Sequence, residues 1–179
     1  YGDWSSDVCS SDLDSVAIVE QVMAQLRALP LDLRPSLLDD MGLEVALRWY
    51  LKRQAERTGW AVDLSADLKD ERLPTDIETV CFRLAQEALT NIARHAQATR
   101  VDIHLRQNDA DLELLIHDNG VGFDVTAARE RATRGASLGL LGMQERAMLA
   151  GGQVEITSQA GGGTDIVARF PLSAPAALP

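Results

Sequence analysis

A long amphipathic helix is predicted between Asp76 and Ala96, and one of its sides must be covered by other parts of the fold. Its apolar side chains recur at spacings of three or four residues and therefore share one face: Ile77, Cys81, Leu84, Ala88 and Ile92. Thr75, after Pro74, is a candidate N-terminal cap. The helix is expected to meet a sheet along its apolar face.

Strands and helices alternate on both sides of this helix. The predicted strands are 61–65, 101–105, 112–117, 154–158 and 165–170. A polar turn at Asn108-Asp109 joins the second strand to the third, and the glycines of 160–163 join the last two. A further helix is predicted from Leu140 to Leu149. The expected fold is an α/β (α+β) two-layer sandwich, in which a mixed, largely antiparallel sheet packs on helices.

The N-terminal part reads differently. Residues 1–13 repeat Ser and Asp without any helical or strand period, and we interpret them as a non-native or disordered leader. From Asp14, a bundle-type seam follows at Val19, Val22, Leu26 and Leu29. The segment LRPSLLDDMGLEVAL (33–47) then leads into a helix over about 43–57. We therefore predict a helical region over 14–58, a main domain over 59–172 and a tail over 173–179.

Composition excludes several classes of function. A net charge of −10 argues against a nucleic-acid surface, which needs clustered Lys and Arg. A nucleotide ligand is not excluded, because backbone N–H groups and a helix N-terminus can bind phosphate. Cys9 and Cys81 belong to no ligand cluster, so neither a disulfide framework nor structural zinc is expected. No apolar run is long enough to span a membrane, and the polar, acidic first residues lead us to expect no signal peptide. We therefore expect a cytoplasmic location and no membrane contact by this chain.

A second stripe on the long helix carries polar groups: Glu87, Asn91, Arg94 and His95. A carboxylate and a carboxamide one turn apart offer two hard oxygen atoms, which suit Mg²⁺ held together with substrate phosphates. The alternative is a solvated helix face.

Three glycine-rich segments are further candidates. In DNGVGFD (118–124), Asp118 ends a strand, and Gly120 and Gly122 allow a sharp turn and a close approach to a ligand. In SLGLLGM (137–143), the start of a helix at Gly139, Leu140 and Gly142 offers free N–H groups to a phosphate. Each segment also has a plain interpretation as a turn or a helix start, and a hairpin turn explains the glycines of GGGT (161–164).

The order and spacing of these motifs resemble the nucleotide-binding domain shared by histidine kinases, gyrase, Hsp90 and MutL. EALTNIARHAQA (87–98) and LRPSLLDDMGLEVAL are similar to sensor histidine kinases of the nitrate-sensor (NarL-partner) type. The resemblance covers about residues 14–172. It implies that 14–58 holds part of the dimerisation helices with a connecting helix, and that 59–172 is the ATP-binding catalytic domain.

The resemblance also implies roles for single residues. Asn91 matches the asparagine that binds Mg²⁺ and ATP, and Glu87 the catalytic acidic residue that polarises the nucleophile. Asp118 matches the aspartate that accepts a hydrogen bond from the adenine amino group, and Thr164 supports it through water. Room for the purine is made by Gly120 and Gly122. The residues next to the phosphates are Gly139, Leu140 and Gly142. Phosphate charge is neutralised by Arg94 and His95. Residues 124–136 correspond to a mobile lid.

The implied activity is transfer of the ATP γ-phosphoryl group to a histidine on a separate helix, and onward to a response regulator, within a homodimeric parent. The chain has only His95, His104 and His117, so we expect a truncated protein that lacks the phosphoacceptor and binds Mg·ATP without phosphorylating itself in the usual way. The strand positions of His104 and His117 favour a structural role. Three alternatives stay open: a nucleotide-binding interaction module without productive transfer, an anti-sigma-factor serine kinase and, least favoured, a gyrase-like ATPase.

Overall fold

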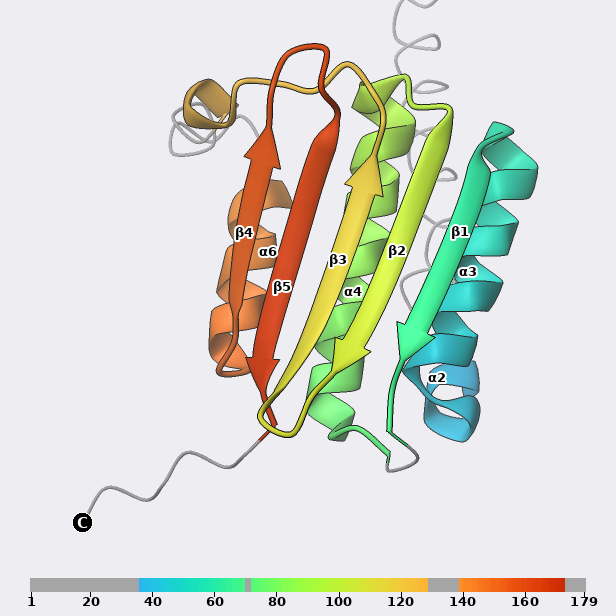
Figure 1. Ribbon diagram of the computed structural model, residues 1–179, viewed down its shortest axis with the longest axis vertical. Helices are drawn as coiled ribbons and strands as arrows, with labels where there is room; N and C mark the ends of the chain where they lie inside the picture. Colours follow the sequence, from blue (N-terminus) through green and yellow to red (C-terminus); the bar gives the residue numbers. More distant parts are fainter. Residues whose placement is uncertain (1–35, 70–71, 129–138, 173–179) are drawn as a thin grey trace, which may run out of the picture. The chain divides into compact units, whose positions relative to one another are not determined.

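The structure, a computed structural model, describes residues 36–69, 72–128 and 139–172. These residues form a five-stranded sheet with the helices on one of its faces (Figure 1). The predicted leader, the predicted seam helix after Asp14, residues 129–136 of the predicted lid and the tail lie outside the described residues.

The sheet is mixed and largely antiparallel, as expected. Its strands are β1 (Ala61–Asp67), β2 (Arg100–Gln107), β3 (Asp111–Asp118), β4 (Gln153–Ser158) and β5 (Thr164–Pro171). Their order is β1-β2-β3-β5-β4, in which only β1 and β2 run parallel within this sheet. All but β1 begin one residue earlier than predicted, and all except β4 also end one or two residues later. Backbone pairing continues through polar residues because every non-proline residue carries the same backbone donor and acceptor.

The helices are α2 (Ser36–Met41), α3 (Leu43–Thr58), α4 (Thr75–Asn91), the π-helical turn η1 (Ile92–Ala96) and α6 (Gly139–Leu149). In Figure 1, α3 lies behind β1, α4 behind the middle of the sheet, and α6 behind β4 and β5. The expectation that Thr75 caps α4 is wrong. Pro74 is the N-cap, with an extended ψ of 133°, and its carbonyl accepts the Glu78 N–H at 3.0 Å. Thr75 is the first helical residue.

The predicted apolar face of α4 forms the centre of the core. Its five apolar residues are 7% exposed or less, and the inward side chains of β2 and β3 are buried as well. Cys81 is fully buried, and this burial raises the pKa of its thiol. Leu43, Leu47 and Leu51 are buried on α3.

An ion pair between the half-exposed Arg72 and the buried Glu78 connects the α2–α3 junction to α4. Glu78 is 2% exposed, and Arg72 Nε lies 3.1 Å from its Oε1. Arg72 Nη2 also donates to the Leu38 carbonyl at 2.6 Å, and this carbonyl accepts the Gly42 N–H as well. Residues 36 onward therefore belong to the same compact unit as the sheet. The domain boundary at residue 58 stays a prediction.

No helix in the described part of the chain combines the length and the apolar character needed to cross a bilayer.

Candidate functional site

The last turn of α4 brings Glu87 and Asn91 together. Both side chains are half-buried, and Asn91 Nδ2 donates to Glu87 Oε1 at 3.3 Å. This bond orients the carboxamide, so that its oxygen is left for a ligand. The stripe predicted from the sequence therefore places a carboxylate and a carboxamide side by side.

The π-helical turn η1 follows directly after Asn91. A π-turn has a wider ring than an α-helix and is common at functional sites. It ends at Gln97, which has a left-handed φ of 52°. The Ala96 carbonyl, freed from the helical ladder, accepts the Val121 N–H at 2.8 Å. The turn thus connects the end of α4 to the loop that follows β3.

Asp118 ends β3 and is only 2% exposed. Its Oδ1 accepts the backbone N–H of Gly120 at 2.8 Å. Within the described part of the chain, its second oxygen has no hydrogen bond. Because Asp118 lines the cavity described below, a ligand N–H group can donate to this oxygen.

The loop after Asp118 is packed too tightly for side chains at its glycines. A Cβ on Gly120 would lie 2.3 Å from the Ala96 carbonyl oxygen. Gly122 has a φ of +61°, and its Cβ would lie 1.9 Å from the Gln159 carbonyl oxygen. In both cases the nearest obstacle is backbone, so the glycines are required by packing within the protein. That they also make room for a purine stays a prediction.

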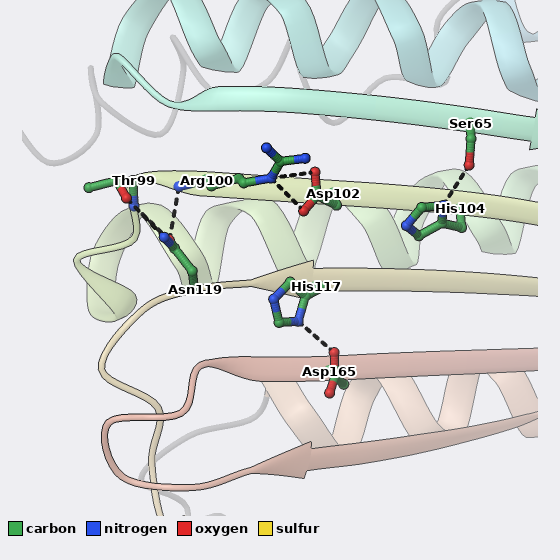
Figure 2. Close-up of polar contacts among 8 residues, drawn as sticks. All are labelled: Ser65, Thr99, Arg100, Asp102, His104, His117, Asn119 and Asp165. Atoms are coloured by element: carbon green, nitrogen blue, oxygen red, sulfur yellow. Dashed lines mark hydrogen bonds and ion pairs between the residues drawn. The ribbon is translucent and has the colours of Figure 1, made fainter.

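Side-chain hydrogen bonds hold the same loop from both sides. Asn119 Oδ1 accepts the N–H groups of Thr99 and Arg100, each at 2.9 Å, and Figure 2 shows Asn119 reaching back to Thr99. Ser158, at the end of β4, accepts the Phe123 N–H at 2.9 Å and donates to the Gly163 carbonyl at 2.7 Å. Sequence reasoning missed both anchors, although Asn119 lies inside the motif that was singled out.

Thr164 lies directly opposite Asp118 in the register of β3 and β5. It is 8% exposed, and its hydroxyl lies 3.1 Å from Ser158 Oγ. The pairing of two strands thus places a hydroxyl beside the buried carboxylate.

The first turn of α6 closes the site from the other side. A Cβ on Gly139 would lie 2.4 Å from Glu87 Oε1 and 3.5 Å from Asn91 Nδ2, so α6 meets α4 at its polar stripe. On the way to α6, a short helical turn at 125–128 is capped by Asp124, whose Oδ1 accepts the Ala127 N–H at 3.0 Å.

These elements enclose a cavity of about 500 Å³, within the usual size range of small-molecule sites. Apolar side chains supply much of its wall, and the polar groups of Asn91, His95, Asp118 and Thr164 are spread around it. The lining residues are Ala88, Asn91, Ile92, His95, Ala96, Asp118, Gly122, Phe123, Ala128, Leu140, Thr164 and Ile166. An apolar slot with one buried carboxylate suits a flat heterocycle that carries an amino group.

The predicted site residues fall into three groups. Six line the cavity: Asn91, His95, Asp118, Gly122, Leu140 and Thr164. Three more support the cavity from outside its lining: Glu87 contacts Asn91, Gly120 contacts Asp118, and Gly139 packs against Glu87 and Asn91. Arg94 is exposed, and neither it nor Gly142 lines the cavity.

His104 and His117 lie on the face of the sheet opposite the helices (Figure 2). His117 Nδ1 contacts Asp165 Oδ1 at 2.7 Å across β3 and β5, and His104 Nδ1 lies 2.5 Å from Ser65 Oγ. Neither histidine lines the cavity.

Asn91 and Glu87 offer too few oxygen atoms to bind magnesium alone, so a bound substrate would have to supply further oxygen ligands. No group of three or more His, Cys, Asp or Glu able to hold a metal occurs in the described ranges. Mg²⁺ typically binds to one or two protein oxygens plus substrate phosphates and water, so this sparse set is compatible with it.

Comparison with known proteins identifies a family. The model of the histidine kinase-, DNA gyrase B- and HSP90-like ATPases matches residues 76–174. The chain is 38% identical over 156 residues to the signal transduction histidine-protein kinase/phosphatase DegS of Brevibacillus brevis, covering 87% of this chain and 39% of DegS. It is 37% identical over 165 residues to the oxygen sensor histidine kinase NreB of Staphylococcus carnosus, covering 90% of this chain and 46% of NreB. The chain therefore spans less than half of either relative.

Solved structures show the same fold. The histidine kinase domain of a blue-light activated histidine kinase from Erythrobacter litoralis superposes with a TM-score of 0.58 at 21% identity. The match covers 73% of this chain and 61% of that one.

Proposed function

Because this chain belongs to the family of histidine kinase-, DNA gyrase B- and HSP90-like ATPases, we propose that its cavity binds ATP together with Mg²⁺. We propose further that the parent protein is a sensor histidine kinase, which phosphorylates a histidine and passes the phosphoryl group to a response regulator in a two-component system.

The observation that carries the proposal is the pairing of Asp118 with Thr164 at one end of the cavity and of Asn91 with Glu87 at the other. The free oxygen of Asp118 is suited to accept a hydrogen bond from the exocyclic amino group of adenine, and the apolar walls to hold the ring. The phosphates would then extend toward Asn91 and the first turn of α6, because the free backbone N–H groups at a helix start can bind phosphate.

The reaction needs little covalent chemistry from the protein. The bond between the γ-phosphorus and the bridging oxygen breaks, a bond from phosphorus to an imidazole nitrogen forms, and ADP leaves. Asn91 holds Mg²⁺, which screens the phosphate charge when bound. Glu87, within reach of Asn91, accepts a hydrogen bond from the incoming imidazole N–H and orients it.

Calorimetry with a non-hydrolysable ATP analogue and magnesium tests the nucleotide site. We expect the wild type to bind the analogue. Asp118→Ala should lower the affinity for the analogue by about ten- to a hundredfold, because a hydrogen bond to a charged group contributes about 1.5–3 kcal/mol. Asn91→Ala should remove the dependence of binding on magnesium. Arg106→Met, on the opposite face of the sheet, is the control. An absence of binding by the wild type refutes the proposal.

The kinase activity is tested on the full-length parent with radiolabelled ATP. Acid-labile label on a histidine is expected, and Glu87→Gln is expected to slow labelling while leaving analogue affinity within about twofold.

A further inference from the structure

Arg146, on α6, carries a polar atom whose burial nothing in the fold explains. Its Nε is buried and has no hydrogen-bond partner, the only such side-chain atom among the described residues. An arginine always carries its charge and offers five N–H donors, so a buried donor without an acceptor is costly. In the part of the chain that the structure describes, Arg146 also makes no ion pair.

The guanidinium group is folded back along α6 toward the N-terminus of this helix. Helical side chains point toward the N-terminus of their helix, over the preceding turn. Here the missing side chain of Gly142 leaves the space, because a Cβ on Gly142 would lie 3.2 Å from Arg146 Nη1 and 3.8 Å from both Cζ and Nη2.

Gly139, Gly142 and Arg146 lie on one face of α6, since their spacings are three and four. At Gly139 this face packs on Glu87 and approaches Asn91. The positive charge of Arg146 therefore lies one turn from the point where α6 meets the polar end of α4. Leu140, which directly follows Gly139, lines the cavity.

We propose that Arg146 is a phosphate-binding residue of this site, and that Gly142 is a glycine because it gives the guanidinium its path. The inference rests on the proposed nucleotide function and extends it to a residue outside the lining of the cavity. Phosphate oxygens of the nucleotide supply the acceptors that Arg146 lacks, through charge-assisted and often paired hydrogen bonds.

The test compares ligands that differ only in phosphates. Affinities of the wild type, Arg146→Met and Arg146→Lys are measured for a non-hydrolysable ATP analogue, ADP and adenosine, each with magnesium. Arg106→Met is the matched control, because it removes an identical charge from the other face of the sheet.

We expect Arg146→Met to lower the affinity for the ATP analogue about tenfold or more, and the affinity for adenosine less than about twofold. Lysine keeps the charge without the planar fork, so Arg146→Lys should recover part of the loss. The Arg106→Met control should match the wild type.

Two results overturn the inference: unchanged affinity for the ATP analogue, or an equal loss for all three ligands, which would mean a purely structural role. If Arg146→Met does not fold, as judged by thermal unfolding, Arg146→Lys carries the comparison alone: it must lose affinity for the ATP analogue but not for adenosine. A wild type that binds none of the ligands refutes the nucleotide function itself, whereas a wild type that binds and an equally strong Arg146→Met refute only the role of Arg146.

Discussion

Replacing Gly122 with alanine should destabilise the protein more than the same change at glycines of similar conformation. Gly122, Gly59 and Gly161 all have positive φ, at +61°, +79° and +78°. An alanine in the left-handed region costs about 1–2 kcal/mol. At Gly122 the new Cβ would also lie 1.9 Å from the Gln159 carbonyl oxygen, whereas the other two positions have no atom within 4 Å.

The steric conflict adds to the conformational cost at Gly122 alone. Forcing extra atoms into a packed region typically costs about 1–3 kcal/mol. Gly122→Ala is therefore expected to lose about 2–5 kcal/mol in all, a large part of the roughly 5–15 kcal/mol that stabilises a typical protein. Gly59→Ala and Gly161→Ala are expected to lose only the conformational part.

Thermal and urea unfolding of the three variants measure this difference. For a chain of this size, each kcal/mol corresponds to a shift in Tm of about 2–4 °C. The Gly122→Ala variant should also bind the ATP analogue more weakly, since the loop between Asp118 and Phe123 has to move. If Gly122→Ala unfolds at the same temperature as Gly59→Ala, the packing explanation of this glycine is refuted.

Two further predictions concern the core and its junction. In a Cys9→Ala background, Cys81 should not react with a water-soluble disulfide reagent at pH 8 until denaturant is added, because burial raises the thiol pKa above its ordinary value of 9.0. For the same reason the free energy of unfolding should fall as the pH rises above about 9, where the thiol of the unfolded chain ionises first. Rapid labelling of the folded protein would contradict both statements. Arg72→Met should expose α2 to hydrogen exchange, because Glu78 loses the partner that also holds the Leu38 carbonyl; unchanged exchange over 36–42 would contradict this.

The sequence was sufficient for most of the elements and for the proximity of Glu87 and Asn91, because both depend on local pattern. The five predicted strands are present, and so are the helices predicted over about 43–57, 76–96 and 140–149, since alternation and helical periodicity are properties of neighbouring residues. The second of these helices consists of α4 and the π-helical turn η1. Glu87 and Asn91 could be placed side by side for the same reason, because one helical turn separates them.

What the sequence could not provide depends on contacts between distant segments. Ser158 holds the Phe123 N–H and the Gly163 carbonyl only because β4, β5 and the loop after β3 converge. The π-helical turn at 92–96 has no clear pattern of its own. Its wide geometry is supported by the bond from Val121 to the Ala96 carbonyl, which joins residues 25 positions apart in the sequence.

The glycines of the loop after β3 have a packing role that the sequence motif alone did not indicate. The sequence motif favours Gly120 and Gly122 for their freedom to turn and to approach a ligand, whereas the atoms that forbid a side chain there belong to Ala96 and Gln159. The close packing of this loop fixes Asp118, and a carboxylate that already binds the Gly120 N–H through one oxygen presents the other in a single direction. Selectivity for an amino-bearing ring would then depend on loop packing as much as on the carboxylate. Gly120→Ala should accordingly reduce the preference for ATP over GTP in competition binding, and an unchanged preference would assign that selectivity to Asp118 alone.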